Sequence, residues 1–254
     1  MFKDVFPVKL IFKPAETFSA LAAGEIGWGW PLALSGASAA ASAFTLCSLP
    51  PEFLAEVTSG VKLAPGRGFL WYLSVGLPGG LGFTLFFCVL LAAFLPYIKA
   101  GRLPVRLALL MLGTGAYGFF FLLPFKTAAY TLAARLLAAL AAAFAIRTAA
   151  VSRLFCARLA KAVLALSILT LAADAVGAAA ALAGSVIAYN AGQYFFAALA
   201  LAYTVKAAAA FSGASAARAA AAVVPAMLAA AAFLFSLSAL GLLSPEIFQT
   251  LLLI

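Results

Sequence analysis

Seven long apolar segments, separated by mostly short connections, constrain the fold of this chain more than any other feature. A helix needs about 20 mainly apolar residues to cross the roughly 30 Å hydrocarbon core of a bilayer. The segments that meet this requirement are Trp28 to Leu49, Gly80 to Ile98, Leu107 to Phe125, Thr127 to Ile146, Ala162 to Ala183, Val186 to Val205 and Ala219 to Leu243. The sequence therefore predicts an all-α, polytopic transmembrane helical bundle with about seven spans.

Composition supports a membrane protein and argues against several other classes. Hydrophobic residues make up 67% of the chain and charged residues 9%, too few to cover the surface of a soluble domain. The net charge of +9 is spread over connections between apolar runs, so we expect no nucleic-acid partner. The chain has no histidine and its three cysteines lie far apart, so we expect no cofactor, no metal and no catalytic residue. The first dozen residues lack the pattern of a cleaved signal peptide, and we expect the chain to insert through its own spans.

Lys and Arg residues near the span ends predict the orientation. One set of connections holds Lys3, Lys9, Lys13, Lys99, Arg102, Arg106, Arg147, Arg153, Arg158, Lys161, Lys206 and Arg218, whereas the opposite set holds Lys62, Arg67 and Lys126. The excess of positive charge marks the cytoplasmic side. This predicts that the N-terminus lies in the cytoplasm and the C-terminus outside.

Residues 1–27 are predicted to form an amphipathic entry segment before the bundle of residues 28–254. Pro14 suits a first helical turn and Glu16 follows within that turn. Lys3, Lys9 and Lys13 are expected to attract anionic lipid headgroups if the segment lies in the interface. The alternative is that the segment packs on the cytoplasmic ends of the spans.

An internal repeat at an offset of 59 residues aligns Tyr130 to Ala149 with Tyr189 to Ala208. Alanines recur at this offset, and Phe144, Ile146 and Arg147 are replaced by similar residues. The pattern predicts a tandem-repeated helical hairpin, with copies at residues 127–183 and 186–243. A low-complexity coincidence between alanine-rich segments is the alternative.

Arg135 and Asp174 are the charged residues that lie well inside predicted spans, where a charge needs a partner or a purpose. Counted from the outer span ends, Arg135 lies about 12 Å deep and Asp174 about 13 to 14 Å deep. The similar depth predicts an interhelical ion pair that fixes helix register. There are two alternatives to a structural ion pair. The two residues could take part in ion or proton movement, or each charge could reach water separately.

Further polar and small residues within spans predict helix contacts. Tyr189, Asn190, Gln193 and Tyr194 gather at the outer end of one span, where we expect hydrogen bonds between helices or, alternatively, a binding site.

Two glycine-rich segments also bear on helix packing. The glycines of GTGAYG at 113–118 match a dinucleotide fingerprint, but an apolar run favours close helix packing instead. Pro78 and the glycines at 79, 80 and 82 predict an outer half-helix, a kink and then a span. Gly184 and Ser185 predict a tight turn that makes the flanking spans antiparallel neighbours.

Four segments of the chain resemble the bacterial branch of the Yip (Ypt-interacting protein) domain family. They are KLIFKPAETFSAL in the entry segment, WGWPLAL at the first span, GTGAYG before Pro124, and FSGASAARAAAAVVP after a late aromatic helix. The resemblance implies a multi-span membrane fold, usually of about five spans. Eukaryotic members associate with prenylated Rab-type GTPases. This chain has an extra hairpin and lacks their Asp-Leu-Tyr-Gly-Pro motif, so the GTPase association is not carried over.

The sequence thus favours a non-enzymatic integral membrane protein that organises membrane or membrane-protein partners. The partner is expected to be another membrane protein or a second copy of the chain in a homo-oligomer. A small-solute or ion transporter or channel that uses Asp174 and Arg135 is the main alternative, and an enzyme acting on lipids is a weaker one. A water-accessible cavity at Asp174 would favour transport, whereas a solid core would favour the organising role.

Overall fold

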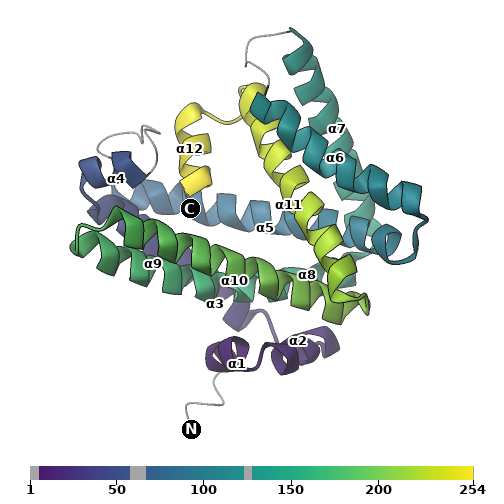
Figure 1. Cartoon of the computed structure of the whole chain (residues 1–254), viewed down its shortest axis with the longest axis horizontal. Helices are drawn as coiled ribbons and strands as arrows, with labels where there is room; N and C mark the ends of the chain where they lie inside the picture. The colour runs from purple at the N-terminus through teal and green to yellow at the C-terminus, as the bar shows by residue number, and fades with distance from the viewer. Residues whose placement is uncertain (1–5, 58–66, 123–127, 254) are drawn as a thin grey trace. The chain divides into compact units, whose positions relative to one another are not determined.

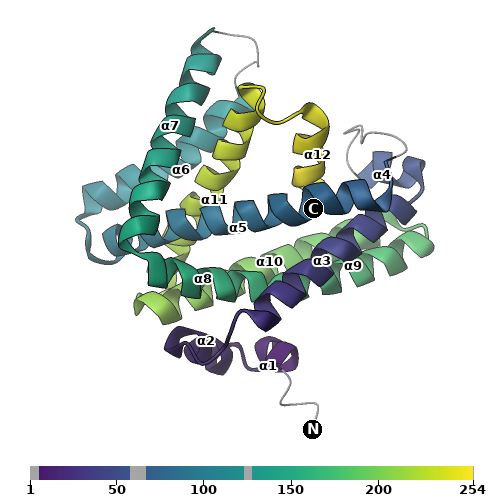
Figure 2. The same cartoon turned by 180° about the vertical axis from the view of Figure 1, so that it is seen from behind.

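A computed structural model describes residues 6–57, 67–122 and 128–253 (Figures 1 and 2). Within these ranges the chain is helical with no strand. The helices are α1 (Phe6–Phe12), α2 (Pro14–Ala23), α3 (Gly29–Ser48), α4 (Pro51–Val57), α5 (Phe69–Ala100), α6 (Leu103–Leu122), α7 (Ala128–Val151), α8 (Arg153–Ala165), α9 (Ser167–Leu182), α10 (Val186–Ser212), α11 (Ala216–Ala239) and α12 (Pro245–Leu253).

The predicted helical membrane bundle is confirmed. Among the described residues, six helical stretches are long and apolar enough to cross a membrane: α3, α5, α7, α8 with α9, α10 and α11. The described part of α6 adds a shorter apolar stretch, Leu103–Gly118, which gives about seven spans. The chain is therefore an integral membrane protein in contact with the lipid bilayer.

Helix α5 runs through the position of the predicted kink, because it continues for 32 residues from Phe69 to Ala100. A bend of this helix at Pro78 stays a prediction. A proline inside a helix costs about 3 kcal/mol. Leaving the helix within hydrocarbon would expose several unpaired backbone groups at several kcal/mol each, which is the larger cost. Gly79 also makes a close contact between two helices. It lies against Leu251 of α12, whose side chain occupies the place where a Cβ of residue 79 would stand.

The chain forms two compact units. The first contains residues 1–82, 161–204 and 249–254, and the second contains residues 83–160 and 205–248. In the first unit α3 packs along α9, and α1 packs on α2. In the second unit α11 packs against both α6 and α7.

In the first unit the entry segment packs against the bundle. Pro14 occupies the first turn of α2 together with Glu16, as predicted. The buried ring of Phe18 meets Tyr203 of α10 edge to face at 6.4 Å, and the Tyr203 hydroxyl donates to the Ile11 carbonyl at 2.9 Å. Lys161 donates to the Ile26 carbonyl at 3.0 Å. These contacts favour the packing alternative for the segment.

The tight turn predicted between the spans at 183–186 is confirmed. Gly184 adopts a positive φ of 65°, which a residue with a side chain rarely takes. Its amide and that of Ser185 close the end of α9, and the Ser185 hydroxyl accepts from the Ala188 amide at 3.2 Å. The turn makes α9 and α10 antiparallel neighbours.

The two halves of the predicted repeat differ in their number of helices, although α8 and α9 together form one candidate span. Residues 127–183 contain α7, α8 and α9, and residues 186–243 contain α10 and α11. Superposition of the two halves in one orientation stays a prediction.

In the second unit Gly113 of α6 lies directly against Pro225 of α11. A Cβ at residue 113 would stand 2.8 Å from the Pro225 Cα, closer than real contacts allow. Among the described residues, nothing lies within 4 Å of such an atom at Gly115 or Gly118. The predicted packing role therefore applies to one of the three glycines.

We expect Gly113→Ala to lower thermal stability in detergent, because it forces α6 away from the Pro225 backbone at a cost of about 1–3 kcal/mol. The matched control Gly115→Ala adds a methyl group in open space and should leave the melting temperature unchanged or slightly raised. Equal effects of the two substitutions would contradict this packing arrangement.

Candidate functional site

Asp174 lies on α9 and accepts a hydrogen bond from the Ser42 hydroxyl of α3 at 2.7 Å. The Ser42 residue is 5% exposed, and Asp174 is half-buried. A hydroxyl that donates to a carboxylate makes a charge-assisted bond, which is stronger than a bond between neutral groups. Ser42 is therefore the polar partner that stabilises the carboxylate at the contact between α3 and α9.

Ser42 belongs to a row of hydroxyl side chains on α3. Ser38, Ser42 and Thr45 follow at intervals of four and three residues, so they share one face, and all three are buried. Ser42 was not among the site residues predicted from the sequence. The helical spacing of these hydroxyls was the signal that could have found it.

Helix α9 also meets α10, through two glycines. A Cβ at Gly177 would stand 2.9 Å from the ring of Tyr189, and a Cβ at Gly192 would stand 3.0 Å from Val176 Cγ1. Each helix thus offers a glycine to a side chain of the other, and the two backbones approach closely.

The polar cluster predicted on α10 divides between two faces. Gln193 donates from Nε2 to the Ala173 carbonyl of α9 at 3.4 Å. The ring of Tyr189 packs edge to face on Phe53 of α4, with 5.6 Å between ring centroids. Tyr194 is 75% exposed. Asn190 lies one helical turn before Tyr194 on α10 and is half-buried. The structure therefore brings Tyr189 and Gln193 to the part of α9 that carries Asp174.

Arg135 lies on α7 in the second unit, and its side chain is exposed. Its neighbour Ala134 is buried in a core cluster with Tyr130 and Ala232. Asp174 lies in the first unit, where Ser42 is its hydrogen-bond donor. The ion pair between Arg135 and Asp174 stays a prediction.

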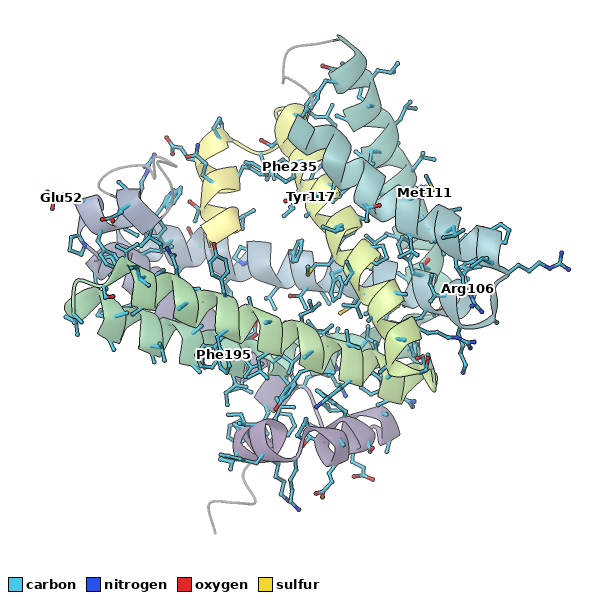
Figure 3. All side chains as sticks on the ribbon, viewed as in Figure 1. Glu52, Arg106, Met111, Tyr117, Phe195 and Phe235 are labelled. Carbon is cyan, nitrogen blue, oxygen red and sulfur yellow. The ribbon has the colours of Figure 1, made fainter. Side chains whose placement is uncertain are left out.

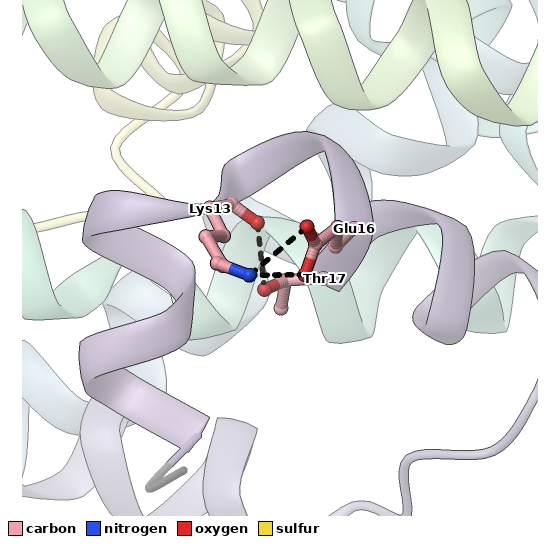
Figure 4. Close-up of polar contacts among 3 residues, drawn as sticks. All are labelled: Lys13, Glu16 and Thr17. Carbon is pink, nitrogen blue, oxygen red and sulfur yellow. Dashed lines mark hydrogen bonds and ion pairs between the residues drawn. The ribbon is translucent and has the colours of Figure 1, made fainter. Parts of the chain in front are cut away.

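The lysines of the entry segment differ in their surroundings. Lys13 forms an ion pair with Glu16, with 3.2 Å between Nζ and each carboxylate oxygen, and its carbonyl accepts from the Thr17 hydroxyl at 3.1 Å (Figure 4). Lys9 lies on α1, and Lys3 lies outside the described residues. The positive charge of Lys13 is therefore partly compensated within the chain.

Comparison of the chain with protein-family models, curated proteins and solved structures finds no match. The candidate site is therefore argued from its geometry. It contains one carboxylate, one buried hydroxyl, one amide and one phenol, carried by three helices of one unit. Such a group can fix the register of the helices, or it can hold a proton or a small cation at the carboxylate.

We expect Ser42→Ala to lower the unfolding free energy by about 1.5–3 kcal/mol, because it removes the donor that faces a carboxylate in an apolar environment. In an Asp174→Leu background the same substitution should cost less than about 0.5 kcal/mol, since the acceptor is gone. Thermal or denaturant unfolding in detergent measures both values.

Ser38→Ala, on the same face of α3, is the matched control and should have the same small effect in both backgrounds. An equal effect of Ser42→Ala with and without Asp174 would show that the hydrogen bond contributes nothing.

Proposed function

We propose that this chain is a non-enzymatic protein of the bacterial inner membrane that organises membrane-protein partners. The observation that supports it is the exposure of α7. In the most apolar 18 residues of the stretch Tyr130–Val151, 6% of the residues are buried, compared with 39% to 50% for the corresponding 18 residues of α3, α5 and α11. A span with so little contact to its own unit has a surface free for lipid or for another membrane helix.

The exposed face of α7 combines leucines with one arginine. Leu132, Leu136 and Leu140 are 60%, 55% and 70% exposed, and Arg135 lies among them. An arginine near the middle of a span costs about 2.5–3.5 kcal/mol on insertion scales unless it is paired. The leucines can face the hydrocarbon of the bilayer, whereas the charge of Arg135 would be stabilised by a carboxylate at a similar depth.

Two carboxylates are candidates for this pairing: Asp174, and an acidic residue in a span of a partner protein. Asp174 already accepts a hydrogen bond from Ser42, and Arg135 is exposed on α7. Both observations favour the partner. We therefore propose that the leucine and arginine face of α7 binds a membrane helix that carries a carboxylate.

The resemblance to the Yip family supports the same class of function, since its eukaryotic members act through other proteins at membranes. The proposed orientation has the N-terminus in the cytoplasm and the C-terminus outside, as the distribution of Lys and Arg predicts. An interfacial role for Lys3 and Lys9 toward anionic headgroups belongs to this proposal as well.

The test is charge reversal at Arg135. We expect Arg135→Asp to abolish co-purification of a membrane partner from native membranes, because two carboxylates would then face each other in hydrocarbon. Changing the intramembrane acidic residue of that partner to Arg should restore capture by the Arg135→Asp protein. Affinity purification with quantitative mass spectrometry measures both effects.

The exposed Arg153 of α8 provides the control, since Arg153→Asp makes the same charge change near a span end. Capture that survives Arg135→Asp, or that no acidic-to-Arg change restores, would contradict the proposed contact. If the captured partner is a second copy of the chain, the reciprocal change at Asp174 is the one to test.

A transporter or channel is the second candidate, and the hydrogen-bonded Asp174 between helices favours it. The hollow lined by Ala15, Glu16, Ser19, Ala20, Ala23 and Glu25 lies on α2 and the residues after it, and Asp174 is not part of its lining. Proton or cation flux into proteoliposomes that Asp174→Asn abolishes would favour transport over the organising role.

A further inference from the structure

The positive charge of this protein belongs to one unit. The second unit contains ten Lys and Arg residues and one acidic residue, Glu246. The first unit contains six basic and six acidic residues, so its formal charge is zero. The whole excess of +9 therefore lies in the second unit, which spans the bilayer with almost no carboxylate of its own.

Three of these basic side chains converge at one point, the end of α5. The Lys99 carbonyl accepts from Arg106 Nη2 of α6 at 3.4 Å and from Arg218 Nη1 of α11 at 3.2 Å. Lys99 Nζ donates to the Ser212 carbonyl at the end of α10, at 2.5 Å. Figure 3 labels Arg106 near the start of α6. Four helix ends of the second unit thus meet at one membrane face.

This convergence brings like charges together without a counter-charge. In the part of the chain that the structure describes, no carboxylate pairs with Lys99, Arg106 or Arg218. The Nε atom of Arg106 is buried and has no hydrogen-bond partner among the described residues. A buried guanidinium N–H that lacks an acceptor is costly, and an anion is the group that would satisfy it.

The backbone contributes both signs of potential here, because the carbonyls at the ends of α5 and α10 accept from Lys99, Arg106 and Arg218. Helices α6 and α11 both begin here, at Leu103 and Ala216, so their N-terminal amides point toward this face. Arg102, which is exposed, directly precedes α6. Helix N-termini and arginines together form the usual surroundings of a bound phosphate.

We propose that Lys99, Arg102, Arg106 and Arg218 bind the phosphate of an anionic phospholipid headgroup. A lipid is the source that fits, because the cluster lies where spans end, at the depth of the headgroups. Anionic lipids also attract basic residues at a membrane surface. This site differs from the entry segment, where Glu16 already compensates Lys13.

The test uses the full-length protein purified in detergent and titrated with phosphatidylglycerol, with bound lipid counted by native mass spectrometry. Each basic side chain near the surface contributes about fivefold to binding of an anionic lipid. The double variant Arg106→Gln with Arg218→Gln should therefore bind phosphatidylglycerol about 25-fold more weakly than the unmodified protein. Phosphatidylcholine should bind weakly and equally to both proteins.

The matched control is Arg153→Gln with Arg158→Gln, which removes the same charge from exposed positions of α8 in the same unit. It should change binding less than about twofold. The conservative variant Arg106→Lys with Arg218→Lys keeps the charge and should retain most of the affinity.

Equal loss in the glutamine variant and the α8 control would overturn the proposal, because bulk charge would then explain binding. Unchanged affinity of the glutamine variant would overturn it as well. Competition by inorganic phosphate at concentrations similar to those of the lipid would overturn the lipid as the source of the anion. If the double variant fails to fold, Arg218→Gln alone, at the exposed start of α11, should weaken binding about fivefold.

Discussion

Backbone hydrogen bonding in hydrocarbon is the constraint on which the rest of this structure depends. A peptide group in the bilayer core has no water to bond with, so each span must satisfy its own N–H and C=O groups. This explains why α5 continues through Pro78 and three glycines that would end a helix in water. Once every span is a helix, side chains decide only how closely the helices approach and where polar groups lie.

Close approach is achieved by single glycines placed opposite one bulky neighbour. Gly113 receives Pro225, Gly177 receives Tyr189, Gly192 receives Val176 and Gly79 receives Leu251. In a bilayer, lipid tails are as apolar as leucine, so helices gain little from burying apolar surface and gain more from close packing. The small residues of this alanine-rich chain therefore carry the tertiary structure, while many leucines and phenylalanines face outward.

The sequence predicted the helices well because long apolar runs in a membrane protein have one structural solution. The positions of Pro14, Glu16, Gly184 and Ser185 also predicted local turns correctly, since capping depends on a few adjacent residues. Pro78 does not end α5, because the rule that proline ends a helix assumes that water can satisfy the freed carbonyl.

The site was harder to predict because its parts come from helices far apart in the sequence. Asp174 was identified as a costly charge, but its donor Ser42 lies 132 residues away in a run of small residues typical of packing. Half of the cluster at 189–194 faces α9 and half does not, a division that depends on the rotation of α10. The repeat and the orientation remain predictions, because they rest on sequence patterns alone.

The reciprocal glycines of α9 and α10 have a mechanical consequence. If one helix slid along the other by a turn, the ring of Tyr189 would meet Ala173 or Ala181, which carry a methyl group where Gly177 carries none. Val176 would lose Gly192 in the same displacement. Steric contact at both glycines therefore opposes sliding of one helix along the other. As long as the contacts at Gly177 and Gly192 hold, Asp174 keeps its axial position relative to α10.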